Sequence, residues 1–419
     1  MNYVVVGSGY GDEGKGLMTD FLVRHSNAKT VIRFNGGAQA GHTVHDGDKR
    51  YVFGHLAAGT LAGADTYLYK KFIINPRVLI REIEDMEKLG VKYPQVYANA
   101  GCKITTIFDI AINVAFELSK GLNAHGSCGL GINETVVRHE TDYHGNAYLT
   151  CLGFVKQQNV RQLAQTLKHI WGSWVPFRLQ QLGITKEVLE KIGNNKIVDF
   201  ITKEPNFIQE ARLMLDALTE IVVVDDGEFD SDSKNVVFEG AQGLGLDEEF
   251  GEFPHVTRSR TGTWNAFQMM HDSCFFPYNF DLQTEVVYVT RAYATRHGNG
   301  PLHMAGTIIS DEKSNIYDNT NIHNAFQGSI RFAPLNLRKM LTLIDKDVQR
   351  TEYFEDDYSK VIALTCMDQL GDTVNVVDVK DTLQTIKSEN LPQIIEEQLG
   401  LSVKYISRGP SAKDVEIVD

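Results

Sequence analysis

A short β-branched run near the start of the chain leads directly into a loop dense in glycine. Val4-Val5-Val6 is followed by Gly7-Ser8-Gly9-Tyr10-Gly11-Asp12-Glu13-Gly14-Lys15-Gly16, and then by an amphipathic segment with apolar residues from Leu17 to Val23. This order predicts a strand, a phosphate-binding loop and a helix. Glycines allow backbone N–H groups to approach phosphate oxygens, and the helix N-terminus adds a favourable dipole. The loop therefore predicts a nucleotide site at the first turn.

Two nucleotide-binding templates fit this loop. Gly9-x-Gly11-x-x-Gly14 satisfies the dinucleotide fingerprint, and Gly9-x4-Gly14-Lys15 satisfies most of a P-loop. The dinucleotide template also needs a carboxylate at the end of a second strand roughly 20 residues on, but the next strand-like run, 30–34, ends in Arg33, Phe34 and Asn35. The P-loop template lacks its Ser or Thr, because Gly16 stands there. Asp12 could supply the missing oxygen for Mg²⁺, which prefers carboxylates and phosphates.

Composition excludes several classes of protein. The 419 residues carry a formal charge of −13, which argues against a nucleic-acid surface. The five cysteines, Cys102, Cys128, Cys151, Cys274 and Cys366, show no paired spacing, as expected in a reducing compartment without structural zinc. No signal peptide is visible, because residues 1–10 enter a strand directly, and no apolar run reaches the roughly 20 residues of a membrane span. We expect a cytoplasmic protein without a membrane partner.

Apolar runs alternate with helical periodicity along the rest of the chain. Strand-like runs at 30–34, 71–74, 236–238, 286–290, 361–365 and 403–406 are mostly followed by glycine-rich or polar loops. Short apolar strands, each followed by such a loop and a helix, predict an α/β fold with a large, mostly parallel central sheet and flanking helices. In such sheets the ligand lies at the carboxyl ends of the strands.

Other segments complete the predicted organisation. Pro76 is expected to start a helix over 77–89, and 107–118 has apolar residues at helical spacing. Residues 44–53 are polar and charged, which is typical of a surface loop. Residues 150–220 are expected to be mainly helical, with Trp171 and Trp174 in the core. Since there is no repeat or low-complexity linker, we expect one domain over 1–419 with a helical insertion around 150–220.

The glycine loops together resemble one known family. Six motifs occur in order: Gly11-Asp12-Glu13-Gly14-Lys15-Gly16; Gly36-Gly37-x-x-Ala40-Gly41-His42-Thr43; Glu239-Gly240-Ala241-Gln242-Gly243; Phe253-Pro254-x-Val256-Thr257; Ala292-Tyr293-x-Thr295-Arg296-x-Gly298-x-Gly300-Pro301; and Gly409-Pro410. This set, which spans nearly the whole chain, resembles adenylosuccinate synthetase. The resemblance implies a P-loop-like nucleotide site and a ligase that uses purine nucleoside monophosphate, L-aspartate and a nucleoside triphosphate.

The resemblance implies a reaction in two steps. The 6-oxo group of inosinate (IMP) is phosphorylated by GTP, and the amine of aspartate then displaces the phosphate to give adenylosuccinate. Asp12 would be the base that accepts the N1 proton, and with the backbone oxygen of Gly41 it would hold Mg²⁺. Lys15 would offset charge on the transferring phosphoryl group, and His42 would donate a hydrogen bond or proton to it.

The resemblance also assigns the binding residues. It implies a nucleoside-monophosphate site of Asp12, Glu13, Gln39, Ala40, Gly41, Cys128, Arg138, Gln242, Thr257 and Ser329. It implies a triphosphate site of Gly11, Glu13, Gly14, Lys15, Gly16, Gly41, His42, Thr43, Arg331, Asp368, Ser407 and Gly409. Aspartate would bind at Gln327, Gly328 and Arg331. Arg138 matches an arginine that the family supplies to the phosphate from a partner subunit, which implies a homodimer.

Departures from the family pattern leave the substrates open. Cys366 replaces the lysine of the guanine site, so the donor is GTP or ATP, and Gln39 and Cys128 replace polar residues of the monophosphate site. Ser329 replaces an arginine that would touch the ribose and aspartate. This altered loop looks like the phage branch that condenses aspartate with dGMP, but that branch typically replaces the aspartate retained here as Asp12. We expect IMP or its deoxy form, with dGMP as the rival.

Two other classes of protein fit the sequence less well. A non-catalytic nucleotide-binding homologue would explain the altered aspartate loop, but such a protein would also be expected to lose Asp12 or His42, and both are present. A dinucleotide-dependent oxidoreductase lacks its ribose-binding carboxylate, so we predict no binding of NADH.

Overall fold

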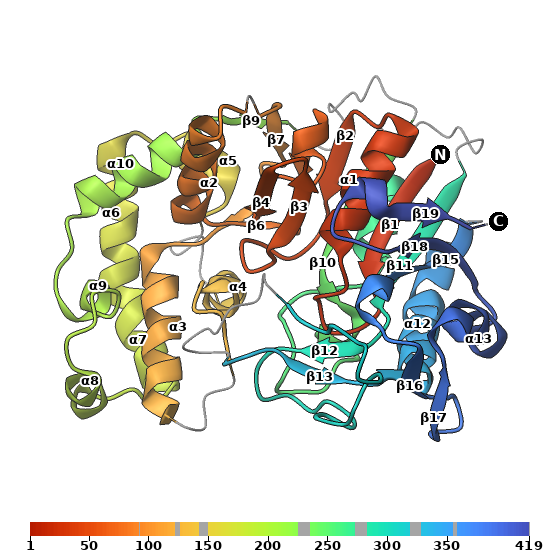
Figure 1. Ribbon diagram of the computed structural model, residues 1–419. Coiled ribbons are helices and arrows are strands. Elements are labelled where there is room, and N and C mark those ends of the chain that lie inside the picture. The colour runs from red at the N-terminus through yellow and green to blue at the C-terminus, as the bar shows by residue number, and fades with distance from the viewer. Residues whose placement is uncertain are drawn as a thin grey trace.

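The computed structural model describes residues 1–91, 93–121, 126–141, 150–224, 235–272, 283–318, 328–354 and 358–418 (Figure 1). In these ranges no helix combines the length and the apolar character needed to cross a bilayer.

A ten-stranded sheet, counted over the described residues, forms the centre of the molecule. Its order is β19-β18-β15-β11-β1-β10-β2-β5-β7-β9, and all neighbours are parallel except β18 and β19. The mostly parallel sheet predicted from the sequence is therefore confirmed. The strands are β1 (Asn2–Gly7), β2 (Thr30–Arg33), β5 (Asp65–Leu68), β7 (Val96–Ala98), β9 (Ile221–Val223), β10 (Val236–Gly243), β11 (Thr284–Arg291), β15 (Tyr358–Thr365), β18 (Ser402–Ser407) and β19 (Val415–Ile417).

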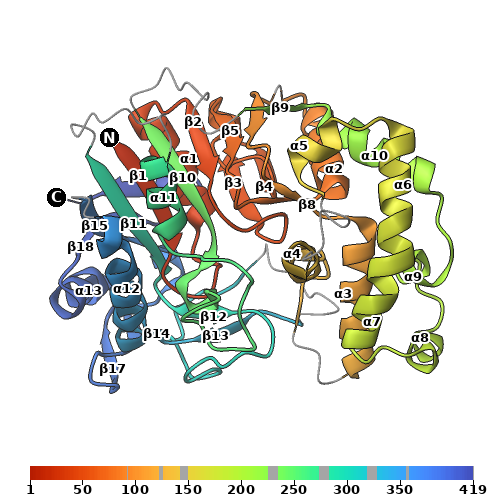
Figure 2. The ribbon, with the colours of Figure 1, turned by 180° about the vertical axis from the view of Figure 1, so that it is seen from behind.

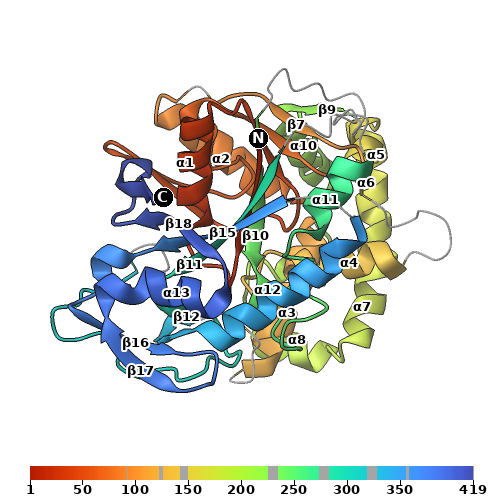
Figure 3. The same cartoon turned by 90° about the vertical axis from the view of Figure 1, so that its right-hand side faces the viewer.

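Helices cover both faces of this sheet, which is why β1 is buried along its whole length. Tyr3 and Val5 pack on the face covered by α1 (Lys15–Ser26). Val4 and Val6 point to the other face, with α11 (Trp264–Asp272), α12 (Leu337–Thr351) and α13 (Leu391–Leu399) (Figure 3). Successive strand residues point to opposite faces, so one β-branched run supplies two apolar layers.

A helical part of the molecule lies beside the β9 end of the sheet (Figures 1 and 2). Its helices share one apolar cluster that includes the fully buried Trp174 and the partly buried Trp171. They are α2 (Pro76–Lys88), α3 (Ile107–Lys120), α4 (Ile132–Thr141), α5 (Leu152–Lys156), α6 (Val160–His169), the π-helical turn η3 (Ile170–Trp174), α7 (Val175–Gln181), α8 (Lys186–Ile192), α9 (Asp199–Thr202) and α10 (Phe207–Leu218). Residues 150–220 are thus mainly helical as expected, while the division into a single domain with an insertion stays a prediction.

The start of α2 follows from local chemistry. The side chain of Asn75 accepts hydrogen bonds from the backbone N–H groups of Arg77 and Val78, and Pro76 occupies the first turn. An asparagine cap satisfies N–H groups that have no partner inside the helix, and proline has no N–H to satisfy there. The helix predicted from Pro76 is confirmed.

The polarity of residues 44–53 predicts a surface loop, but this prediction is wrong. These residues form most of a hairpin of β3 (His42–Asp46) and β4 (Lys49–Phe53), which are antiparallel. The hairpin is anchored by Val44 and Phe53, which are buried in an apolar cluster, and its turn contains Gly47 with a φ of 59°. Val44 and Phe53 bury one side of the strand pair, and Tyr51 packs against the same cluster.

Short strands and 3₁₀ turns complete the described structure. The strands are β6 (Ile73–Ile74), β8 (Lys103–Ile104), β12 (Ala294–Arg296), β13 (Arg331–Ala333), β14 (Leu335–Asn336), β16 (Thr373–Val377) and β17 (Leu383–Lys387). The turns are η1 (Thr60–Ala62), η4 (Leu244–Leu246), η5 (Glu352–Phe354), η6 (Met367–Gln369), η7 (Ser388–Asn390) and η8 (Ala412–Asp414).

Candidate active site

The loop after β1 is held by its own glutamate. Oε1 of Glu13 accepts hydrogen bonds from the N–H groups of Gly9 (3.1 Å) and Gly11 (2.7 Å). These two glycine N–H groups therefore point at a carboxylate of the chain. The first backbone hydrogen bond of α1 runs from Met18 to the carbonyl of Gly14, so the preceding N–H groups at the start of this helix are the ones left for a phosphate.

The loop lysine is buried beside these N–H groups. Nζ of Lys15 donates to the carbonyl of Gly11 at 2.7 Å and forms an ion pair with Oε2 of Glu13 at 3.0 Å. Gly14, at the N-cap of α1, has a φ of 97°, which favours glycine. After the left-handed turn at Gly14, the ammonium group of Lys15 lies against Gly11 and Glu13 of the loop, at the N-terminus of α1.

A cleft of about 320 Å³ opens at the carboxyl ends of the parallel strands. Loops after β1, β2, β15 and β18 line it, as the strand order predicts. It contains these residues of the predicted triphosphate site: Gly11, Gly14, Lys15, Gly16, Gly41, His42, Thr43, Asp368, Ser407 and Gly409. Asp12 and Cys366 line it as well. Two predicted members, Glu13 and Arg331, do not.

His42 is held by a buried glutamate from the neighbouring strand β10. Nδ1 of His42 lies 2.5 Å from Oε1 of Glu239, while Nε2 is buried and has no hydrogen-bond partner among the described residues. Glu239 also accepts the N–H of Ala58 at 3.1 Å and lies 3.7 Å from Nε of Arg33. The imidazole is therefore fixed from behind, with Nε2 left for a ligand in the cleft that His42 lines.

The charges in this group follow from burial and from its partners. Burial lowers the pKa of His42, helped by Arg33 and Lys15 and opposed by Glu239. Burial alone would raise the pKa of Glu239, but His42 and Arg33 outweigh it and hold that pKa below its ordinary value. The resting state is thus a neutral imidazole that donates Nδ1–H to an ionised carboxylate.

Asp12 has a histidine and an arginine as neighbours. Oδ2 of Asp12 lies 3.5 Å from Nε2 of His297, and Nε of Arg291 donates to the backbone carbonyl of Asp12. Arg291 is itself fixed by an ion pair with Asp318 at 2.6 Å. Burial raises the pKa of Asp12, with a smaller contribution from Glu13 and opposition from His297 and Arg291. A carboxylate with a raised pKa suits proton abstraction.

A second cavity, of about 530 Å³, lies on the other side of the first loop. It is bounded by Ser8, Gly9, Tyr10 and Glu13 and by residues 336–343 at the start of α12. Arg291 lines both this cavity and the cleft. Apart from Glu13, no residue predicted for the substrates lines this cavity.

The predicted monophosphate residues lie outside both of these hollows, except for Asp12, Glu13 and Gly41. The amide of Gln39 is buried and has no hydrogen-bond partner among the described residues. Gln242 has a φ of 65°, beside the first loop. Cys128 and Thr257 are half-buried, and Ser329 is exposed. Ala40 is buried.

Arg138 lies in the interior of the subunit. Its side chain is fully buried, with Nε and Nη2 donating to the carboxylate of Asp109 at 2.9 and 2.8 Å. Nη2 also donates to the carbonyl of Ile104 and to Oγ1 of Thr150, each at 3.1 Å. These contacts hold the guanidinium inside its own subunit, and its reach into a partner's site stays a prediction.

The predicted aspartate loop is described only in part. Gln327 lies outside the described residues, and Gly328 has a φ of 68°. Nη2 of Arg331 donates to the carbonyls of Gly298 at 2.6 Å and Gly300 at 2.5 Å. Arg331 thus fixes the loop after β12, and neither hollow includes it.

Sequence reasoning missed three residues that support the site. Glu239 was noted as part of a motif without a role, although a carboxylate at the end of a buried strand beside a glycine loop was a usable signal. Arg291 and His297 had no such signal. They lie far from Asp12 in the sequence, and only the pairing of β1 with β11 brings the ends of these strands and the segments that follow them together.

The fold and the cleft define an α/β nucleotide-binding protein. Its phosphate loop carries Asp12 and Lys15, and His42 lines the same cleft. A family model described as adenylosuccinate synthetase matches residues 4–315. The chain belongs to the adenylosuccinate synthetase family, and it is a ligase that forms a C–N bond.

Named relatives agree with this family. The chain is 29% identical to an adenylosuccinate synthetase from Borrelia duttonii, over 76% of this chain and 69% of that protein. It is 32% identical to one from Methylococcus capsulatus, over 72% of this chain and 64% of the relative's length.

Two solved structures share the fold. The fully ligated adenylosuccinate synthetase from Plasmodium falciparum is similar with a TM-score of 0.68 at 18% identity, covering 100% of this chain and 99% of that one. The succinoaminodeoxyadenylate synthetase (PurZ) of cyanophage S-2L, bound to dGMP and to dATP as an energy donor, is similar with a TM-score of 0.62 at 16% identity, covering 99% and 95%.

Proposed function

We propose that the protein condenses L-aspartate with the 6-oxo position of IMP, or of its deoxy form, using GTP or ATP. The γ-phosphoryl group of the donor is transferred to O6, and the amine of aspartate then displaces phosphate from C6. The observation that carries this proposal is that Asp12, Lys15 and His42 line one cleft at the carboxyl ends of the strands.

Each of these side chains has one task in the proposed mechanism. Asp12 accepts the N1 proton of the base, which makes O6 a nucleophile toward phosphorus. Lys15 offsets the negative charge of the transferring group. His42, held through Nδ1 by Glu239, takes a proton at Nε2 when the anionic triphosphate arrives, because added negative charge favours the imidazolium. It then donates to the transferring phosphoryl group.

The site residues fit a magnesium ion. Asp12 offers a carboxylate on the cleft, and Gly41 lines the same cleft. Oxygen ligands shared with phosphates, completed by water, are what Mg²⁺ prefers. When bound, the ion supplies further positive charge for the transferring phosphoryl group. Asp12 and Gly41 would hold it, while Lys15 and His42 act directly on the phosphates.

The rival substrate is dGMP. One observation favours it: Ser329, where the family has arginine, is exposed. Cys366, which lines the cleft at the position where the family's guanine site has lysine, leaves both GTP and ATP open as the phosphate donor. The S-2L enzyme, which shares the fold, is bound to dGMP and dATP. Asp12 favours IMP, because the phage branch typically replaces this aspartate. A cytoplasmic homodimer, with Arg138 reaching the partner's site, remains part of the proposal.

The test is phosphate release by the purified protein with Mg²⁺ and L-aspartate. IMP, dIMP, GMP and dGMP are crossed against GTP and ATP. We expect turnover with IMP or dIMP, and turnover only with dGMP would replace the proposal by its rival. Asp12→Asn keeps the size of the side chain but removes the base, so it should reduce turnover by about 10²–10⁴-fold without changing the melting temperature much. A fully active variant would contradict the mechanism.

A further inference from the structure

An imidazole lies against the proposed catalytic carboxylate, and the predicted site did not include it. Nε2 of His297 is 3.5 Å from Oδ2 of Asp12, with side-chain exposures of 19% and 20%. Nδ1 of His297 is buried and has no hydrogen-bond partner among the described residues. The imidazole therefore contacts the charged group that would meet the substrate base, and its other ring nitrogen makes no hydrogen bond to the described residues.

His297 lies beside Asp12 but does not line the donor cleft that Asp12 shares with Lys15 and His42. In a 6-oxopurine, N1 lies between C6, which carries O6, and C2. If O6 faces the phosphate donor and N1 faces Asp12, then the C2 edge turns to the side on which His297 lies.

This position matters because hypoxanthine and guanine differ at C2. Guanine presents N1–H and a 2-amino group, which together can bind both oxygens of one carboxylate in parallel hydrogen bonds. Hypoxanthine presents only N1–H. Because Nε2 of His297 lies 3.5 Å from Oδ2 of Asp12, a 2-amino group could pair with that oxygen only by displacing the imidazole.

We propose that His297 determines base specificity by occupying the second oxygen of Asp12, so that the site selects 6-oxopurine nucleotides without a 2-amino group. This inference rests on the proposed function, because Asp12 meets N1 only if a 6-oxopurine nucleotide is the acceptor. It makes His297 a specificity-determining residue rather than a group that transfers a proton.

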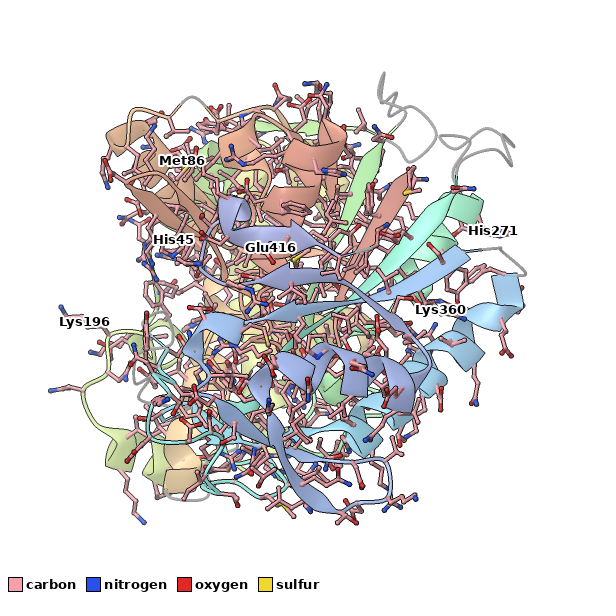
Figure 4. The ribbon with its side chains drawn as sticks, turned by 45° about the vertical axis from the view of Figure 1, so that its right-hand side comes forward. His45, Met86, Lys196, His271, Lys360 and Glu416 are labelled. Carbon is pink, nitrogen blue, oxygen red and sulfur yellow. The ribbon has the colours of Figure 1, made fainter. Side chains whose placement is uncertain are left out.

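The test compares binding of IMP and GMP by titration calorimetry, without aspartate or donor, so that no turnover is needed. We expect the wild-type protein to bind IMP at least about tenfold more tightly than GMP, the scale on which a pocket discriminates a small substituent. His297→Ala should reduce this ratio about tenfold, whereas His297→Gln, which can still donate to Asp12, should retain most of it. His271→Ala is the matched control, because His271 lies at the outer edge of the molecule at the end of α11 (Figure 4).

Each result decides the question. An unchanged ratio in a folded His297→Ala variant, or a wild-type protein that prefers GMP or dGMP, would overturn the inference. If the wild-type protein shows the expected ratio and the variants change it, but IMP gives no phosphate release with either donor and aspartate, the inference holds and the proposed function fails. Binding of neither nucleotide overturns both.

Discussion

The buried carboxylate of Glu239 has two roles, as the counter-ion of Arg33 and as the acceptor that orients His42, and the Glu239→Gln variant tests both. Glu239 is fully buried and lies 3.7 Å from Nε of Arg33, which is also fully buried. At an effective dielectric constant of about 20, charges this far apart attract by about 4 kcal/mol. The amide keeps the size of the side chain but loses the charge, and Arg33 is left without its counter-ion. Removing one partner of a buried pair typically costs about 3–5 kcal/mol of unfolding free energy.

The same change affects catalysis through His42. The imidazole loses the ionised acceptor that orients it at 2.5 Å and raises its proton affinity. We expect the turnover number to fall by about 10²-fold or more, the usual contribution of a positioned acid or base. Turnover is measured as phosphate release at saturating substrate, and stability by denaturant titration. Because the variant is destabilised, both are measured below its melting temperature.

His42→Ala is the control, because it removes the imidazole and leaves the pair of Arg33 and Glu239 intact. We expect the same loss of turnover with a smaller loss of stability. The double variant should be no less active than either single variant, since residues that act as a unit have non-additive effects. A stable Glu239→Gln variant with normal turnover would refute the role of Glu239 in positioning His42.

Three further changes test other parts of the structure. Arg138→Ala leaves Asp109 buried without its ion-pair partner, so the unfolding free energy should fall by about 3–5 kcal/mol. Weaker monophosphate binding at unchanged stability would instead support the partner-site role of Arg138. Burial raises the pKa of Asp347 to about 6, so the folded state takes up a proton that the unfolded state does not between about pH 6 and pH 4. Relative to the Asp347→Asn variant, the unfolding free energy of the wild type should rise by about 3 kcal/mol as pH falls through this window. Unfolding free energies of the two proteins that follow the same pH dependence would contradict this. A Cβ at Gly243 would lie 2.5 Å from the carbonyl oxygen of Gly9, so Gly243→Ala should weaken triphosphate binding in calorimetry and lower stability by about 1–3 kcal/mol, whereas unchanged affinity would show that the first loop tolerates the shift.

The sequence by itself determined the architecture and the donor cleft. Strands of apolar residues that end in glycine loops have few alternatives to a parallel sheet, because both faces must be covered. Parallel strands place their carboxyl ends at one edge, which predicted that the glycine loops meet there, and the family resemblance added His42 and Asp368 to the same site. Each of these residues lies in or next to a loop that follows a strand of the sheet.

Tertiary structure alone decided which side chains serve the site and which serve the fold. Arg138 matches a ligand-binding arginine by motif, but the carboxylate of Asp109 lies close enough to hold it in the interior. The polar segment 44–53 became a hairpin because the apolar cluster accepts Val44 and Phe53.

The position of His297 beside Asp12 depends on the pairing of β1 with β11, whose sequences are more than 270 residues apart. Charge pairs of this kind have no periodicity and no local signature, since they are set by which strands become neighbours. The sequence therefore specifies where a nucleotide binds, while the packing of distant segments sets the proton affinities and the contacts around the base.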